Sequence, residues 1–548
     1  MSKYYLYTIK PGDTLYGISK ENLGDGSRYL EIQKLNSDVI INPRNIQPGT
    51  KILLPPSPDE TNQAQNSPTL IEPLPSEILP LLMQDSSMLS GEGTTLLSGC
   101  IQKCPLEETT SYDEIFSHTI TARLFFDGTG ANEINVSIGR SDKDSDIYKK
   151  YGGSGTSYDD DFSNIARLWK EFKEEKSTYF DHYINIYTSG IGTVDREDDS
   201  IIGLGLGQWD TGVKGKAKLC MSELINSILN LRIPKGHTIK YIHLDLFGFS
   251  RGAACARYFI AMALGILWFQ ESISERVKSY GYALGECEVK FVGLFDTVAS
   301  FGVAHFNDTR NLELDSIQYA SHVFQLAASD EHRDNFRLTN TKSFLKGTTQ
   351  WFLPGAHADV GGSYVNNLSE KNWQLLDKGR LTPFSLKFRD AADKDKQWFI
   401  NKGYYKPDEF VDLYYPLLDD LDSRDLDSRL AVVAATRKEK ISNEYSFIPL
   451  RVMASLAEEY GITFCCLDSE YKIPQDLEWL NDEIDKYIVE CRKRNKISVQ
   501  EDWLDIETDK FKDFRYKYVH CSARYGETLG KDDPNFENGK RKRIIQDG

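Results

Sequence analysis

The sequence predicts an α/β protein whose main body is a mostly parallel β-sheet with helices on both faces. Three observations lead to this fold class. From residue 118 onward, apolar strand-like runs alternate with helical stretches, the pattern typical of βαβ units. The predicted strands end in glycines beside polar or charged residues, as expected where a parallel sheet builds a site. The first 55 residues carry a separate strand–helix–helix–strand pattern.

Length and composition set the outer limits. A chain of 548 residues is too long for one core and predicts two to four units. A hydrophobic content of 40% indicates globular rather than disordered structure. The net charge of -17 argues against duplex nucleic acid as the main partner. A local basic cluster near the C-terminus, "GKRKR" at 539–543, is interpreted as a solvated tail.

Cysteine usage and apolar runs bear on the compartment. The nine cysteines lack paired C-x-x-C spacing, which favours reduced thiols in a bacterial-type cytoplasm over zinc sites. The N-terminal "MSKYYLYTIK" has no apolar core of a signal peptide. The longest apolar run, "YFIAMALGILWF" at 258–269, is too short to span a bilayer and predicts a buried helix. Export would therefore need a dedicated machine.

The N-terminal unit, residues 1–55, is predicted to be βααβ. "YYLYTIK" alternates like a strand, "PGDTLYGISKENLG" contains a turn and a helix, "SRYLEIQKLNS" is a second helix, and "NIQPGTKILLP" closes with a strand. These segments resemble a LysM domain. The resemblance implies binding of N-acetylglucosamine-containing glycans such as peptidoglycan, with use as a docking module left open. The residues to which it assigns glycan binding are Gly12, Asp13, Thr14, Asn36, Pro48 and Gly49.

The segment 56–115 is predicted to be a linker because it is rich in Pro, Ser, Gln and Asp. The α/β core is predicted over 116–368. Its strands are expected in "TITARLFFDGTG", "YFDHYINIYTSGIGT", "YIHLDLF", "CEVKFVGLFDTVASFG" and "TTQWFLPGAHADVGG". Residues 369–548 are more charged, include the amphipathic helix "SFIPLRVMASLAEEYGI", and are expected to complete the same domain as a mainly helical region, with a possible lid or membrane contact.

The strongest chemical motif is G-x-S-x-G, formed by Gly248, Ser250 and Gly252 between a predicted strand and a predicted helix. In that context the serine sits on a sharp turn at the carboxyl end of the sheet and serves as a nucleophile. An ordinary glycine-rich turn is the plainer interpretation, so the motif needs a base and an acid as partners.

His357 is the favoured base, because "LPGAHADVGG" places it in a loop directly after a predicted strand. His520, expected at the end of a short strand in "YVHCSARYG", is the rival. His243 lies inside the serine strand and is expected to be covered. His332 is expected in a pocket wall.

Asp296 is the favoured acid, because it ends the strand that follows the serine helix. Asp359 is too close to His357 in sequence to orient it easily from behind. The resulting order Ser, Asp, His is that of α/β-hydrolases. An oxyanion hole is expected from the backbone of Arg251 and of the turn at Asp127 and Gly128.

Two other chemistries were weighed. "GLGLGQWDTGVKGK" at 203–216 has neither dinucleotide-fingerprint nor P-loop spacing, so no cofactor is predicted, and a loop near the pocket mouth is expected instead. A metal centre formed by Asp127, Asp296, His357 and Asp359 is conceivable. It would leave the serine turn unexplained.

The ordered set "FFDGTG", "SGIGT", "GFSRGA", "LFDTVAS", "ASDEHRDNF", "PGAHADVGG" and "NEYSFIPLRVMA" resembles the α/β-hydrolase domain of type VI secretion lipase effectors of the phospholipase A kind. The resemblance covers about 118–460. It implies a Ser250–His357–Asp296 triad acting on membrane phospholipids, with a spike protein as carrier and a cognate immunity protein. It also implies synthesis in the bacterial cytoplasm and action in the target periplasm. The alternative is a LysM-anchored envelope esterase or binding protein acting on cell-wall acyl groups.

Overall fold

The structure is a computed structural model in which the chain divides into two compact units, Met1–Ser111 and Tyr112–Gly548. In the first unit it describes residues 5–10, 13–23, 28, 32, 36, 40 and 50–54. In the second it describes 116–173, 175–199, 211–266, 272–299, 312–347, 349–374, 386–411, 435–494, 496, 498–524, 534–537 and 540–548. The predicted linker, the glycine-rich loop at 201–210 and most of the second N-terminal helix lie outside these residues.

The N-terminal unit has the predicted outer strands and first helix. Strand β1 (Tyr5–Thr8) pairs antiparallel with β2 (Lys51–Leu54), and helix α1 (Leu15–Leu23) follows the first turn. The Thr14 hydroxyl accepts from the Gly17 N–H at 3.0 Å, which caps this helix. Apolar side chains of α1, of β2 and of residues outside these elements form one small core, against which Tyr7 of β1 packs: Ile9, Leu15, Ile18, Leu23, Ile32, Ile40, Ile52 and Leu54.

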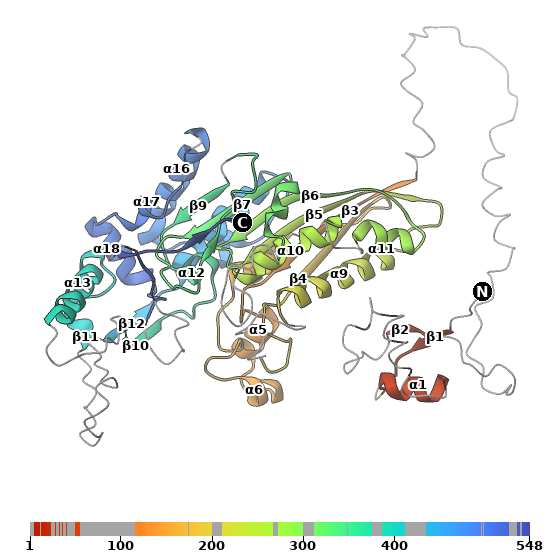
Figure 1. Ribbon diagram of the computed structural model, residues 1–548, viewed down its shortest axis with the longest axis horizontal. Coiled ribbons are helices and arrows are strands. Elements are labelled where there is room, and N and C mark those ends of the chain that lie inside the picture. Colours follow the sequence, from red (N-terminus) through yellow and green to blue (C-terminus); the bar gives the residue numbers. More distant parts are fainter. Residues whose placement is uncertain are drawn as a thin grey trace, which may run out of the picture. The chain divides into compact units, whose positions relative to one another are not determined.

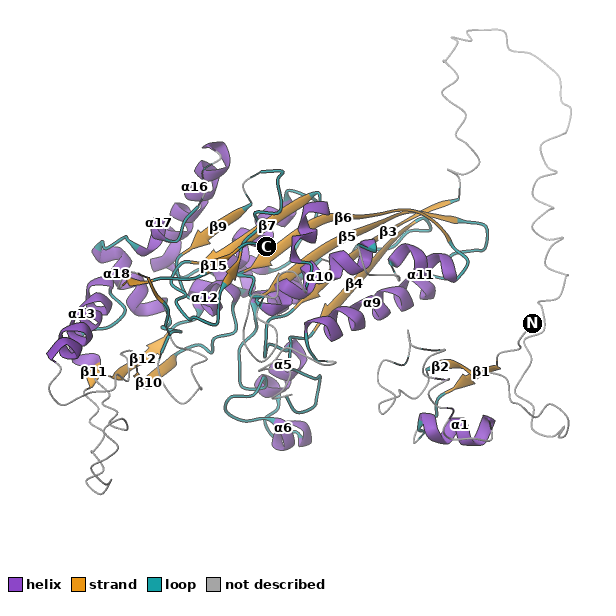
Figure 2. Ribbon diagram, viewed as in Figure 1, coloured by secondary structure: helices purple, strands orange, loops and turns teal. Residues whose placement is uncertain are grey.

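A six-stranded sheet, entirely parallel, organises the second unit (Figure 2). Its order is β4-β3-β5-β6-β7-β9. The strands are β3 (Ser117–Phe126), β4 (Asp181–Thr188), β5 (Thr238–Phe249), β6 (Ala283–Phe295), β7 (His322–Ala328) and β9 (Gln350–Leu353). The predicted α/β class is confirmed. Strand β7 was not predicted, because the short run "HVFQLAA" does not distinguish a buried strand from a helix segment.

Side chains on the sheet alternate between two cores. On β5, Phe247 and Phe249 face one core, whereas Leu244 and Leu246 face the other. Figure 1 shows the helices that cover the second face: α9 (Val213–Asn230), α10 (Arg251–Leu264) and α11 (Ile273–Ser279). The first core includes side chains of α7 (Asn164–Glu171) and α14 (Phe447–Glu458). The predicted amphipathic helix at 446–462 is thus α14.

Residues after 368 pack into the same core as the sheet, since Trp351 of β9 and Trp503 belong to one cluster. This region contains a small antiparallel sheet of β10 (Leu368–Gln374), β12 (Ala435–Ile441) and β11 (Phe410–Val411). Its longer helices are α13 (Leu386–Lys402), α16 (Glu478–Arg494) and α18 (Asp509–Tyr518). The smaller elements of the unit are α5 (Glu133–Ser141), α6 (Asp146–Tyr151), α12 (His357–Gly361), α15 (Leu467–Glu470), α17 (Glu501–Leu504), β8 (Leu338–Thr339), β13 (Phe536–Glu537), β14 (Lys540–Arg541) and β15 (Ile545–Gln546).

Two predictions about the C-terminal region are wrong. The segment around "YVHC" is not a strand: it is the end of α18 and an irregular stretch, because Phe511, Phe514 and Tyr518 bury one helical face. The basic cluster at 539–543 is not a solvated tail. Arg541 and Arg543 are buried, because each forms an ion pair with an aspartate of the domain.

Within the described residues, no helix has the length and apolar character needed to cross a bilayer. Residues 258–263 of the long apolar run are buried in α10, as predicted. The described cysteines carry free thiols.

Three histidines meet at the amino end of the sheet. His118 Nδ1 lies 2.9 Å from His182 Nε2, and His118 Nε2 lies 2.8 Å from His237 Nδ1. Burial lowers the pKa of His118, and the neighbouring histidines lower it further. Burial also lowers the pKa of His182. The fold therefore favours the neutral rings.

We predict that this cluster makes the domain sensitive to acid. Because the folded-state pKa of His118 lies below the unfolded value of about 6.5, its contribution to stability is present above that pH and is lost as the pH falls. Between pH 7.5 and 5.5, wild type should lose roughly 1–3 °C more in Tm than His118→Gln, which cannot be protonated. Thermal melts of both proteins at both pH values test this, and equal losses would contradict it.

Candidate active site

Ser250 lies in a sharp turn between β5 and α10. Its φ of 57° and ψ of -126° place it in a backbone region that non-glycine residues seldom adopt. The flanking glycines permit this turn. A Cβ on Gly248 would lie 2.6 Å from the Ala253 Cα, and one on Gly252 would lie 2.2 Å from the Asp127 carbonyl oxygen. The turn holds the serine hydroxyl at the carboxyl edge of the sheet, beside the first turn of a helix.

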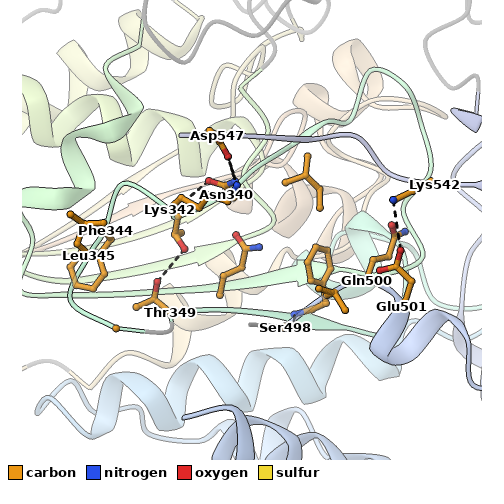
Figure 3. A pocket seen from close by; sticks show the side chains of 16 residues that line it. Asn340, Lys342, Phe344, Leu345, Thr349, Ser498, Gln500, Glu501, Lys542 and Asp547 are labelled. Carbon is orange, nitrogen blue, oxygen red and sulfur yellow. Dashed lines mark hydrogen bonds and ion pairs between the residues drawn. The ribbon is translucent and has the colours of Figure 1, made fainter. Parts of the chain in front are cut away.

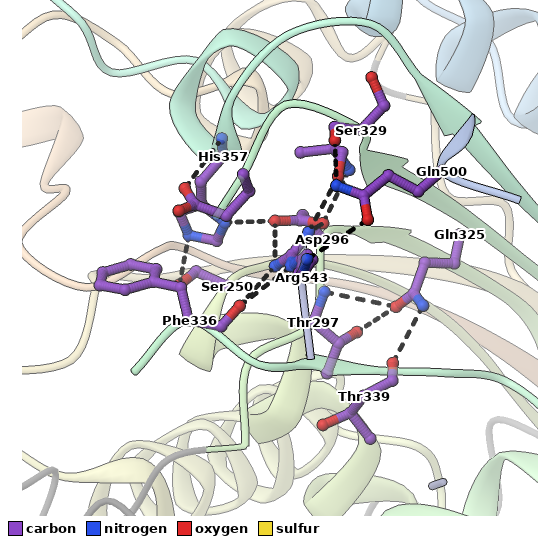
Figure 4. Close-up of polar contacts among 12 residues, drawn as sticks. Ser250, Asp296, Thr297, Gln325, Ser329, Phe336, Thr339, His357, Gln500 and Arg543 are labelled. Carbon is purple, nitrogen blue, oxygen red and sulfur yellow. Dashed lines mark hydrogen bonds and ion pairs between the residues drawn. The ribbon is translucent and has the colours of Figure 1, made fainter. Parts of the chain in front are cut away.

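Ser250 is linked through hydrogen bonds to two residues that follow other strands of the sheet (Figure 4). The Ser250 hydroxyl lies 2.8 Å from His357 Nε2, and His357 Nδ1 lies 2.5 Å from Asp296 Oδ2. Asp296 follows β6 directly, and His357 is the first residue of α12, just after β9. Because all the strands are parallel, their carboxyl ends deliver the three side chains to one edge. The arrangement is that of a nucleophile, a base and an orienting acid.

Asp296 is fully buried and has several donors. The Arg543 guanidinium donates to both carboxylate oxygens, at 2.5 Å to Oδ1 and 2.8 Å to Oδ2. The Ala328 N–H also donates to Oδ1, at 2.9 Å. Burial acts to raise the pKa of Asp296, but the Arg543 charge and the His357 hydrogen bond outweigh it, so the pKa lies below its usual value. The carboxyl is therefore ionised at neutral pH.

The ring of His357 is also buried. Burial lowers the pKa of His357, although the hydrogen bond and charge of Asp296 act in the opposite direction. The imidazole is consequently neutral near pH 7. With Nδ1–H donated to Asp296, Nε2 carries the lone pair that faces the serine hydroxyl.

The turn after β3 lies next to the serine turn. The Asp127 carboxylate accepts from the Ser163 hydroxyl and the Tyr187 hydroxyl, both at 2.5 Å, and from the Gly128 N–H at 2.7 Å. Burial raises the pKa of Asp127 to about 6. The Arg251 guanidinium crosses to this turn, where Nε donates to Thr129 Oγ1 at 2.7 Å. The Asp127 side chain thus shapes the turn, and its Gly128 amide is engaged by that carboxylate.

The segment "ASDEHRDNF" supports His357 from behind, a role that sequence reasoning missed. The Asp330 carboxylate accepts from the Gly355 N–H at 2.6 Å, and the Glu331 carboxylate accepts from the His357 N–H at 3.4 Å. The Phe336 ring lies edge-on to the His357 imidazole, with 5.1 Å between centroids. Arg543 was missed too. The only sequence signal that could have indicated buried arginines was the spacing of Arg541 and Arg543, because residues two apart lie on the same face of an extended segment.

The other histidines have different positions. His520 is buried and its Nδ1 lies 2.6 Å from Asp359 Oδ1, so it forms a second histidine–aspartate pair. Its Nε2 has no hydrogen-bond partner among the described residues. His332 packs against Trp398 inside the domain rather than lining a pocket wall. His243 is partly exposed beside Glu288 and is not covered as expected.

The residues weighed as a metal centre are engaged separately. Asp127 binds Ser163 and Tyr187, whereas Asp359 binds His520 and the Ala356 N–H. Across the described ranges, no group of three or more His, Cys, Asp or Glu side chains has the arrangement of a metal site.

A cavity of about 660 Å³ opens near the β9 edge (Figure 3). It is lined by residues such as Asn340, Leu345, Val499 and Ile545. None of the triad residues belongs to its lining, so it is separate from the site at Ser250.

Two family models match the chain. One, described as T6SS, phospholipase effector Tle1-like, catalytic domain, matches residues 279–382. The other, described as LysM domain, matches residues 7–55. The chain is thus similar to a LysM domain over residues 7–55 and to the Tle1-like catalytic domain over residues 279–382. The resemblance predicted from the sequence is confirmed for both parts.

One solved structure agrees with the fold, and a second was matched with a lower TM-score. A structure of the Tle1 effector bound to the VgrG spike from the type 6 secretion system is 23% identical, with a TM-score of 0.51, and the match covers 78% of this chain and 94% of that chain. An uncharacterized protein from Pseudomonas aeruginosa is 17% identical, with a TM-score of 0.37, and the match covers 70% of this chain and 52% of that chain. None of the curated proteins compared matches the chain.

We predict that Ser250 is an activated nucleophile that depends on His357 and not on His520. A fluorophosphonate probe should label wild type at Ser250, and His357→Ala should slow the labelling at least about 100-fold, because a positioned base contributes that much. His520→Ala is the matched control, since it also removes a buried histidine paired with an aspartate. It should change the labelling rate less than about tenfold. The reverse ranking would move the base to His520.

Proposed function

We propose that the protein is a lipolytic serine esterase of the phospholipase A type, used as an antibacterial effector of a type VI secretion system. The observation that carries this proposal is the continuous hydrogen-bonded relay from Ser250 through His357 to Asp296, on a strained turn at the carboxyl edge of a parallel sheet. Such a relay makes a serine hydroxyl nucleophilic toward an ester carbonyl.

In the proposed mechanism, Ser250 Oγ attacks the ester carbonyl carbon of a glycerophospholipid while His357 Nε2 takes the hydroxyl proton. The tetrahedral intermediate collapses to an acyl-enzyme as the ester C–O bond breaks, and His357 gives the proton to the departing lysophospholipid oxygen. His357 then takes a proton from a water molecule that attacks the acyl-enzyme, and returns it to Ser250 Oγ as the fatty acid leaves. Asp296 stays ionised and stabilises the imidazolium formed at each step.

The oxyanion is proposed to bind backbone N–H groups at the junction of the two turns. The N–H of Arg251, the residue after the nucleophile, starts helix α10, where the helix dipole favours negative charge. The turn at Asp127 and Gly128 is the proposed second donor. For this, the Gly128 N–H would exchange its bond to the Asp127 carboxylate for one to the oxyanion.

The choice of a phospholipid rests on the match of residues 279–382, which include Asp296 and His357, to a phospholipase effector family. A relative with the same fold is described as bound to a VgrG spike, so we propose a spike protein as carrier for this chain. A cognate immunity protein and action in the target periplasm, after synthesis in the bacterial cytoplasm, complete the proposal.

The LysM domain is proposed to bind peptidoglycan through the turns at each end of its helices. Asp13 accepts from the Tyr7 hydroxyl at 3.0 Å and from the Lys10 N–H at 2.7 Å, and buried Asn36 donates to the Ile32 carbonyl at 2.7 Å. Asp13, Thr14 and Asn36 thus shape the domain itself. Gly12, Pro48 and Gly49 lie outside the described residues.

The match of residues 7–55 to a LysM domain favours one second candidate, an esterase that removes acyl groups from the cell wall. Both candidates use the same triad, so only the substrate separates them. Release of fatty acid from lipid vesicles supports the phospholipase. Release of acetate from acetylated peptidoglycan supports the wall esterase.

Ser250→Ala is expected to abolish phospholipid hydrolysis. On vesicles of phosphatidylethanolamine and phosphatidylglycerol, fatty-acid release should fall by a factor of about 10⁴ or more, because triad members act as a unit. The Tm should stay close to wild type, since the hydroxyl serves chemistry. Ser316→Ala, which also removes a buried hydroxyl, should retain activity. Undiminished fatty-acid release by Ser250→Ala would end the serine mechanism.

Deletion of residues 1–55 should separate glycan binding from hydrolysis. The two compact units suggest that turnover of a soluble ester will stay within about threefold of wild type. Sedimentation with insoluble peptidoglycan should be lost. Retained sedimentation would reassign the LysM domain to docking, and collapse of esterase activity would mean that the two parts share a core.

A further inference from the structure

The Arg543 guanidinium touches both the acid of the triad and the residue that packs against its base. Its Nη1 and Nη2 donate to the two oxygens of Asp296, and its Nε and Nη2 donate to the Phe336 carbonyl at 3.0 and 2.9 Å. We propose that Arg543 is a positioning residue of the triad, which fixes the plane of the Asp296 carboxylate and thereby the orientation of His357. This inference rests on the proposed serine mechanism.

The bidentate geometry explains how a guanidinium could do this. A carboxylate on a single hydrogen bond can rotate about its Cβ–Cγ bond, whereas one held on both oxygens by a planar guanidinium cannot rotate without breaking two charged bonds. Asp296 Oδ2 accepts from both Arg543 and His357, and Oδ1 accepts from Arg543 and the Ala328 N–H. The direction in which Oδ2 faces His357 Nδ1 is therefore set by Arg543.

The second contact acts on the other side of the base. Phe336, whose carbonyl accepts from Arg543, places its ring edge-on to His357, at an interplanar angle of 73°. The Arg333 guanidinium lies over the same ring and pairs with Glu331. One arginine thus holds the Asp296 side of the imidazole directly and the Phe336 side through the backbone (Figure 4).

Arg543 is itself fixed by the backbone around it. The Gln500 side chain accepts from its N–H at 3.3 Å, and the Gln500 amide in turn donates to the Ser329 carbonyl at 2.5 Å. The following residues form β15, which pairs parallel with β8, as the Leu338 N–H donates to the Ile544 carbonyl at 3.0 Å. The side chain is wholly buried. Its hydrogen bonds to Asp296 and to the carbonyls of Ala328 and Phe336 hold the buried guanidinium in one orientation.

The chain offers a matched control two residues away. Arg541 is also buried and also forms a bidentate ion pair, with 3.1 Å from Nε to Asp395 Oδ1 and 2.8 Å from Nη2 to Asp395 Oδ2. Asp395 is on α13 and belongs to no triad contact. Loss of Arg541 therefore reports the structural cost of removing a buried arginine from this segment.

The test compares Arg543→Met, Arg543→Lys and Arg541→Met by kcat and KM on a soluble ester, with Tm measured for each. Arg543→Met should lower kcat at least about 100-fold and leave KM within about threefold of wild type. The reason is that a misoriented His357 stabilises the transition state less well but does not change substrate binding. Arg543→Lys retains the positive charge but not the planar, bidentate guanidinium, and its kcat should be at least about tenfold higher than that of Arg543→Met. Arg541→Met should lower Tm comparably and change kcat less than about threefold.

A double variant shows whether Arg543 acts through Asp296. When Asp296→Asn is already present, adding Arg543→Met should lower kcat less than about threefold below that of Asp296→Asn alone, because the carboxylate that Arg543 holds is already absent. Independent, multiplying losses would overturn the proposal, as would equal kcat losses in Arg541→Met and Arg543→Met. If Arg543→Met does not fold, the same cycle with Arg543→Lys decides the question. Failure of the proposed function is distinguishable, because wild type would then show no Ser250-dependent hydrolysis.

Discussion

The buried negative charge of Asp296 is the constraint on which the rest of the site depends. Taking a carboxylate out of water costs several kcal/mol even after the protein relaxes, and removing one partner of a buried ion pair costs about 3–5 kcal/mol. The cost of burying the Asp296 charge is offset by three groups. These are the equally buried guanidinium of Arg543, the Ala328 N–H and the His357 ring. Only with these donors in place does the carboxyl stay ionised and keep the imidazole in the tautomer that faces Ser250.

A second constraint acts on the backbone where β3 and β5 end. The serine turn approaches the first-strand turn so closely that the position of Gly252 leaves no room for a side chain, and Gly248 is packed as closely against Ala253 within the serine turn. Ser250 and Asp296 both have positive φ, so the proposed nucleophile and acid are held in conformations that a free chain seldom adopts. The parallel sheet supplies the rigidity for this strain, because the Ser250 N–H donates to the Phe295 carbonyl and the Asp296 N–H donates to the Leu326 carbonyl.

The sequence was sufficient for the parts of the site that depend on local pattern. Alternating strands and helices predicted the sheet, and glycine spacing predicted the turn at Ser250. His357 and Asp296 could be placed because each follows a strand, and parallel strands end at one edge. Their actual distances depend on tertiary packing. The loop position after a predicted strand favoured His357 over His520, but both histidines are buried and both pair with an aspartate, so only the tertiary structure shows that it is His357 that lies beside the Ser250 hydroxyl.

Arg543 could not be predicted for a related reason. A run of basic residues is usually solvated, and only the positions of partly exposed Asp395 and buried Asp296 make Arg541 and Arg543 exceptions. The role of the whole region after residue 368 was equally hard to predict, because its charged residues find their partners far away in the sequence. The edge of the sheet that carries the triad consists of loops whose carboxylates, Asp330, Asp359 and Asp296, need donors that the strands do not provide. Residues far downstream supply them: Arg515 for Asp330, His520 for Asp359 and Arg543 for Asp296. The C-terminal region is therefore the part of the fold that supplies charged and hydrogen-bonding partners to these three buried carboxylates at the edge of the sheet.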